Sequence, residues 1–144
     1  MTIEVVMRNG IQSVYLSLGN EACFFLQLLN IAEKASGHNI DIETAAWLCS
    51  LKNYIYLNWN DLTDKKNFLI NAKGHAQILE LFTGKRWLYT KESPSYRAKK
   101  NEYIINEWQN GSFIHFDSDD FHSLQKSNTI EKGKIISRRV FKIV

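Results

Sequence analysis

The pattern of apolar and polar positions is helical near the front of the chain. Residues 22–35 are apolar almost all round, which predicts a helix buried on most of its faces. Asn20 is a good N-cap, and Glu21 places a negative charge in the first turn, where the helix dipole favours it. Gly37 is a suitable C-cap. Two further helices are predicted, over about residues 42–56 and 73–82.

The back half of the chain has a different pattern. Short aromatic or β-branched segments are separated by turn-forming pairs at positions 110–111, 118–119 and 132–133. This spacing is typical of an antiparallel meander with tight turns. The expected strands cover residues 86–90, 102–108, 112–117, 121–124 and 134–144. Helices followed by such a sheet predict an α+β fold.

Length and composition limit the class of protein. The chain has 144 residues, 44% apolar and 23% charged, which fits a single globular domain over residues 1–144. The net charge is +3, but the basic residues are scattered, so no nucleic-acid partner is expected. No apolar run is long enough for a membrane helix, and the N-terminus does not resemble a secretory signal. We therefore expect a soluble, cytoplasmic domain with no membrane partner and two free thiols.

Cys23 is the residue most suited to chemistry. If Asn20 is the N-cap, Cys23 occupies the third helical position, where unpaired backbone N–H groups and the positive helix end stabilise a thiolate. The alternative interpretation is a small core residue, because free cysteine is among the most buried residue types. Cys49 lies in the middle of a predicted helix and is expected to be core.

Two histidines form a second candidate group. With a two-residue turn at positions 118–119, His115 lies directly opposite His122, on the same face of a hairpin. One imidazole can then orient the other, as a general base requires. The alternative is an exposed polar face of an edge hairpin. Zinc-capable residue types are present, but no CxxC, HExxH or phosphate-loop motif occurs, so neither a metal nor another cofactor is expected.

The order of these parts resembles papain-like cysteine hydrolases, which place a cysteine at the start of a buried helix and a histidine on a later strand. The resemblance is closest to NlpC/P60-type amidases, to peptidases that cleave double-glycine leaders, and to a group of uncharacterised spirochaete and phage proteins. It is carried by the segments SLGNEACFFLQLLNIA, SFIHFD and SNTIEKGKIISRRVFKI, and it covers most of the chain.

The resemblance implies a role for each matching residue. Cys23 would be the nucleophile, His115 the general base and His122 the orienting residue. The glutamine that such enzymes use as an oxyanion donor is replaced by Ser17, which leaves Asn20 or Gln12 as possible donors.

The implied function is a cysteine peptidase or amidase acting on a peptide or a cell-wall peptide. Because a missing oxyanion donor lowers the rate on the order of a hundredfold or more, an inactive papain-like domain is the first alternative. Such a domain would serve as a binding or phage-accessory module. The second alternative is a small-ligand binding domain of unrelated fold.

Overall fold

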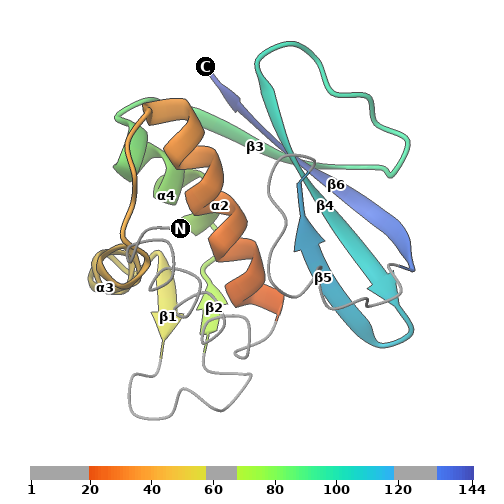
Figure 1. The fold of residues 1–144 in the computed structure, drawn as a ribbon, viewed down its shortest axis with the longest axis horizontal. Coiled ribbons are helices and arrows are strands. Elements are labelled where there is room, and N and C mark those ends of the chain that lie inside the picture. Colours follow the sequence, from red (N-terminus) through yellow and green to blue (C-terminus); the bar gives the residue numbers. More distant parts are fainter. Residues whose placement is uncertain (1–19, 58–67, 119–132) are drawn as a thin grey trace, which may run out of the picture.

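The computed structural model describes residues 20–57, 68–118 and 133–144, and it is an α+β fold. The described helices are α2 (Asn20–Ser36), α3 (Ile42–Leu51) and α4 (Gly74–Thr83). A small antiparallel sheet pairs β1 (Ile55–Leu57) with β2 (Phe68–Ile70). The larger antiparallel sheet contains β3 (Trp87–Glu92), β4 (Glu102–Asn110), β5 (Phe113–Asp117) and β6 (Lys134–Ile143). Helix α2 lies between this larger sheet and the remaining described elements (Figure 1).

The larger sheet has the order β3-β6-β4-β5, so the predicted meander is wrong. The last strand does not follow its neighbour in sequence but is inserted between β3 and β4. Its neighbouring residues Val140 and Phe141 are 3% and 0% exposed. Consecutive side chains of a strand point to opposite faces, so β6 is covered on both faces, as a central strand must be. The predicted hairpin at Gly111 is confirmed, and this glycine has a φ of 59°.

The helix predictions are confirmed except at one boundary, the end of α3. Asp41 caps α3, because its side chain accepts a hydrogen bond of 2.9 Å from the backbone N–H of Thr44. The predicted extension of this helix to residue 56 is wrong, since α3 ends at Leu51 and Asn53 adopts a φ of 62°. Beyond that point the chain forms β1, whose partner β2 was not predicted.

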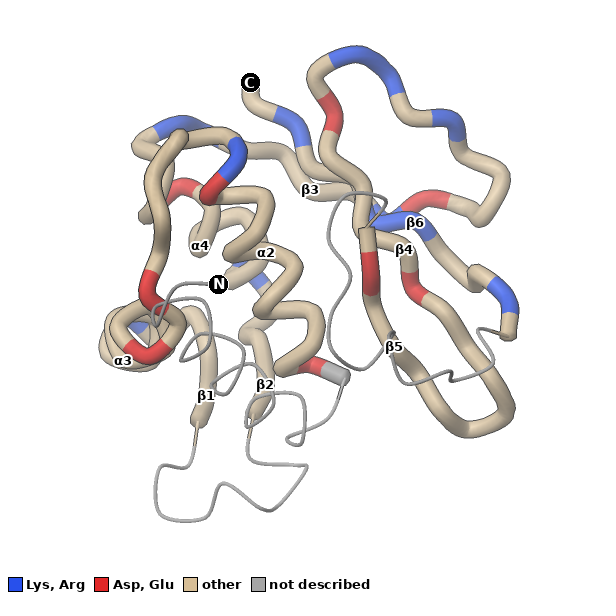
Figure 2. Tube along the Cα trace, viewed as in Figure 1, with Lys and Arg blue, Asp and Glu red and all other residues tan. Residues whose placement is uncertain are grey.

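The core forms around the apolar faces of α2. The ring of Phe24 packs against Phe116 of the larger sheet at a centroid distance of 4.5 Å, and Phe25 packs against Phe68 of the small sheet at 5.2 Å. One helix therefore holds the two sheets together. Figure 2 shows that α2 carries charge only near its two ends, and its middle part is uncharged. None of the described helices is both long and apolar enough to cross a membrane.

A half-buried polar network lies on the side of the larger sheet that faces α2. Arg139 donates to Glu107 at 2.9 Å and to the hydroxyl of Tyr89 at 2.5 Å. Ser137 donates to the same carboxylate at 2.6 Å and accepts from Arg139 Nε at 3.0 Å. The Arg139 guanidinium also lies 5.6 Å from the centre of the Phe24 ring. The network therefore places a compensated charge directly against the helix that carries Cys23.

His75 lies next to this network and stacks on Tyr89 at a centroid distance of 4.8 Å. Burial, followed by the positive charge of Arg139, lowers the pKa of His75 to about 4, although a backbone hydrogen bond at Ala72 opposes the shift. The imidazole is therefore neutral in the folded chain at neutral pH.

This pKa shift predicts a loss of stability in acid. The unfolded chain binds a proton at His75 near pH 6.5, but the folded chain resists it until about pH 4. Stability is therefore complete above the unfolded value and falls as the pH decreases from about 6.5 towards 4. Allowing for solvent screening, we expect this histidine to account for on the order of 2 kcal/mol of the loss at the acid end.

Urea unfolding at a series of pH values measures this loss. His75→Phe retains an aromatic ring against Tyr89 and should reduce the acid-side loss. The control His38→Gln changes an exposed histidine and should leave the loss unchanged. Identical pH dependence for His75→Phe and the unaltered chain would contradict the interpretation.

Candidate active site

Cys23 lies in the first turn of α2 and is fully buried. Its Sγ donates a hydrogen bond of 3.2 Å to the backbone carbonyl of Phe116 on β5. The structure describes α2 from Asn20 onward, and residue 19 lies outside the described residues, so the N-cap role of Asn20 stays a prediction. Cys23 is the fourth residue of α2 as the structure describes it, in the turn where the helix dipole acts.

His115 lies on β5 and is 2% exposed. Its partner across the β4–β5 ladder is Trp108, and the two rings are stacked at 6.1 Å with an interplanar angle of 6°. The indole Nε1 of Trp108 donates to Asp117 at 2.8 Å. Asp117 follows His115 by two positions and therefore projects from the same face of the strand. Trp108 and Asp117 thus fix the surroundings of the imidazole.

Helix α2 and strand β5 meet at the outer edge of the strand, through Cys23 and the backbone of Phe116. Because Phe116 packs its ring against Phe24 of α2, alternation along the strand directs His115 to the opposite face. The Phe116 carbonyl, one residue after His115, accepts the hydrogen bond from the Cys23 thiol. Among the described strands, β5 is an edge strand with β4 as its neighbour. The thiol therefore approaches the backbone of the histidine-bearing strand from its edge.

Gln27 is a site residue that the sequence analysis missed. It lies one turn after Cys23 on the same face of α2, is fully buried, and donates from Nε2 to the Phe116 carbonyl at 3.4 Å. Its Oε1 is buried and has no hydrogen-bond partner among the residues that the structure describes. The available signal was a single polar residue in the otherwise apolar run of residues 22–29. Two side chains of α2 therefore converge on one carbonyl oxygen of β5.

Several predicted features lie outside the described residues. These are Gln12, His122, position 119 of the predicted turn and the strand over residues 121–124. The opposition of His115 and His122 therefore stays a prediction, as does an oxyanion role for Gln12 or Asn20.

Both Cys23 and Cys49 are buried, and neither is in a disulfide. Burial raises the pKa of the Cys49 thiol to about 12. Its thiolate population is therefore very small at neutral pH, and its position within α3 agrees with the predicted core role. Within the described part of the chain, no three His, Cys, Asp or Glu side chains are grouped so that they could hold a metal ion.

Comparison of the chain with protein-family models, with curated proteins and with solved structures gave no match, so the site is interpreted from its own residues.

Proposed function

We propose that the chain is a papain-like cysteine peptidase or amidase that uses Cys23 as nucleophile and His115 as general base. The observation that carries the proposal is the contact between the Cys23 sulfur and the Phe116 carbonyl, next to His115. It joins the first turn of a buried helix to a histidine-bearing strand of an antiparallel sheet. This is the arrangement of parts that the sequence resemblance implies.

The proposed reaction follows from the chemistry of these groups. His115 accepts the proton of the Cys23 thiol, and the thiolate attacks the carbonyl carbon of the scissile amide. Backbone N–H groups in the first turn of α2 are suited to stabilise the oxyanion. His115 then protonates the leaving amine, and a thioester remains on Cys23. Water hydrolyses this thioester, which releases the acid and restores the thiol.

Trp108 and Asp117 are proposed as positioning residues for His115. A catalytic imidazole must keep one orientation, and the parallel indole ring of Trp108 limits its rotation. The hydrogen bond from Trp108 to Asp117 in turn limits movement of the indole. This support is independent of His122, which the sequence analysis proposed as the orienting residue.

A second candidate function is favoured by the burial of Cys23. The side chain is 0% exposed, and its sulfur donates to a carbonyl, so the thiol is protonated and shielded in this conformation. Catalysis requires a movement that exposes the sulfur to substrate. A papain-like domain that binds peptides without cleaving them requires no such movement.

Alkylation tests whether Cys23 becomes a reactive thiolate. We expect iodoacetamide at neutral pH to modify Cys23 faster than Cys49, because only Cys23 lies at a helix start. The pKa of about 12 at Cys49 suppresses its thiolate. Mass spectrometry of the digested protein gives the two rates. The variants Cys23→Ser and Cys49→Ser provide matched controls, each leaving one thiol.

The rates distinguish the two functions. Faster modification of Cys23, slowed by His115→Ala, supports the enzyme. Equal rates for Cys23 and Cys49 contradict the proposed thiolate, and very slow modification of both favours the binding domain.

A further inference from the structure

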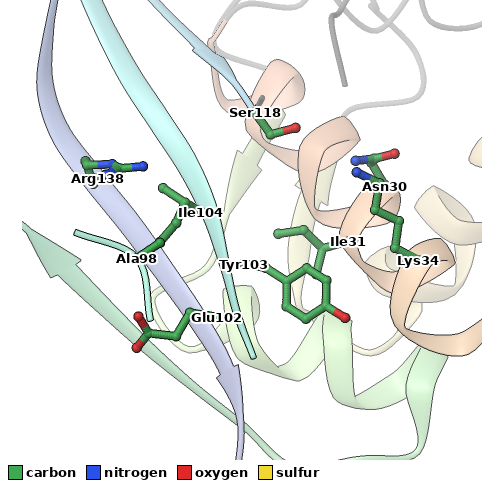
Figure 3. A pocket seen from close by; sticks show the side chains of 9 residues that line it. All are labelled: Asn30, Ile31, Lys34, Ala98, Glu102, Tyr103, Ile104, Ser118 and Arg138. Carbon is green, nitrogen blue, oxygen red and sulfur yellow. The ribbon is translucent and has the colours of Figure 1, made fainter. Parts of the chain in front are cut away.

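A pocket of about 240 Å³ lies between the second half of α2 and strands β4 and β6. Figure 3 shows Asn30, Ile31 and Lys34 of α2 on one side of it, and Ile104 and Arg138 of the strands on the other. The wall is therefore formed by elements far apart in sequence, and the pocket contains basic side chains from two of them.

The guanidinium of Arg138 is held in place by neutral groups. Its Nε donates to the side-chain oxygen of Asn106 at 3.2 Å, and its Nη1 donates to the backbone carbonyl of Tyr96. Within residues 20–57, 68–118 and 133–144, no carboxylate lies within ion-pair distance of Arg138. Its position is thus fixed while its charge is not neutralised, as in a site prepared for an anion.

The other polar groups of the pocket are compatible with an anion. Asn30, Tyr103 and Ser118 supply neutral groups that can donate hydrogen bonds, and Lys34 supplies a second positive charge. The carboxylate of Glu102 accepts hydrogen bonds from the Tyr96 hydroxyl at 2.8 Å and from the backbone N–H of Lys99 at 2.8 Å. These donors, with the positive charges of Lys99 and Lys142, lower the pKa of Glu102. The carboxylate of Glu102, which lines this pocket, is therefore already hydrogen-bonded to donors of the chain itself.

The pocket and the candidate active site lie along the same face of α2, with the buried Gln27 between them. Cys23, Gln27 and Ile31 are spaced by four residues and share that face. Ile31 is two turns beyond Cys23, about 12 Å along the helix axis. On the facing side, Ser118 follows Phe116 by two residues. An extended peptide covers this separation with about four residues.

We propose that the pocket binds the carboxylate of an acidic residue in a peptide, about four residues from the bond presented to Cys23. Arg138 and Lys34 are the specificity-determining residues. The inference rests on the proposed function for the identity of the ligand as a peptide, but it does not require that the peptide be cleaved.

Binding to the full chain carrying Cys23→Ala tests the proposal without hydrolysis. The probes are two capped, alanine-rich peptides that are identical except for one Glu or Gln, and acetate alone. Titration followed by amide NMR shifts gives the Kd. We expect the Glu peptide to shift the amides of Ile104 and Ser118 and to bind roughly tenfold more tightly than the Gln peptide, as for one charged hydrogen bond.

Two variants separate the contributions of the basic residues. Arg138→Gln is expected to weaken binding of the Glu peptide roughly tenfold. Lys34→Gln is expected to weaken it by a factor of about three, because its ammonium is more exposed. The matched controls Arg86→Gln and Lys52→Gln change exposed residues outside the pocket and should leave the Kd unchanged.

Equal binding of the Glu and Gln peptides would overturn the proposal, as would acetate binding as tightly as the Glu peptide. If Arg138→Gln does not fold, unchanged binding by Lys34→Gln is the overturning result. Retained Glu selectivity in a chain that shows no hydrolysis would support the pocket while rejecting the enzyme.

Discussion

Replacing Cys23 with alanine is expected to reduce amide hydrolysis to background, and His115→Ala should lower it by on the order of a thousandfold or more. Cys23→Ala removes the atom that forms the thioester. His115→Ala leaves the thiol but removes the group that accepts its proton. Turnover is measured by mass spectrometry on a proteome-derived peptide library and on purified cell-wall peptides, which cover the two expected substrate classes.

The chain contains a matched control for this experiment. Cys49→Ala also removes a fully buried thiol, but from the last turn of α3, away from the β5 carbonyl that Cys23 contacts. It should retain hydrolysis as long as the protein folds. Full activity of Cys23→Ala would reject Cys23 as nucleophile. Binding of peptides by the unaltered chain with no cleavage of either substrate class would favour the inactive-domain alternative.

The parts of the fold that were predicted correctly depend on local signals. The C-terminal ends of α2 and α4 follow from apolar runs that end near Gly37 and Gly84, both of which have positive φ. The β4–β5 hairpin follows from the Asn110-Gly111 pair. In each case residues adjacent in sequence determine the conformation, so the sequence pattern was sufficient.

The missed features depend on contacts between distant segments. Residues 55–57 continue a helical apolar pattern, but they pair with residues 68–70 and form β1 instead. The position of β6 between β3 and β4 is likewise fixed by pairing across long sequence separations. Tertiary pairing overrode the local pattern at both places.

The same distinction applies to the candidate site. Cys23 and His115 were proposed from their residue types and their places in a helix and a strand, and the structure brings their elements together. Gln27 and the contact between Trp108 and Asp117 were missed because they depend on the approach of α2 to β5 and on the register of β4 and β5. Such features follow only from the assembled fold.

The second large effect concerns the ion pair between Arg139 and Glu107, on the side of the larger sheet that faces α2. Glu107→Gln is expected to lower the free energy of unfolding by about 2–4 kcal/mol, somewhat less than for a fully buried pair. The side chains of Arg139 and Glu107 are 14% and 13% exposed. Burial alone would raise the pKa of Glu107. Hydrogen bonds from Ser137 and Arg139, together with the charge of Arg139, outweigh burial and lower this pKa. The variant leaves the Arg139 charge against the Phe24 and Phe116 rings without its carboxylate.

The pH dependence of this effect has a defined sign. A carboxyl group with a lowered folded pKa stabilises the protein above its ordinary pKa, and that stabilisation is lost as the pH falls through the lowered value. The difference in unfolding free energy between Glu107→Gln and the unaltered chain should therefore be full at neutral pH. It should shrink below about pH 4, as Glu107 becomes protonated. Urea unfolding at several pH values measures this difference, and exposed Glu43→Gln is the control.

A double replacement separates the cost of an isolated charge from the value of the pair. Glu107→Leu combined with Arg139→Met removes both charges and fills their space with apolar atoms, so it should recover most of the stability lost by Glu107→Gln. Such recovery would show that α2 is held mainly by its apolar packing on Phe116, the residue whose carbonyl also meets Cys23. If Glu107→Gln lowers the free energy of unfolding by less than about 1 kcal/mol, the ion pair between Arg139 and Glu107 behaves instead like a solvent-screened surface pair.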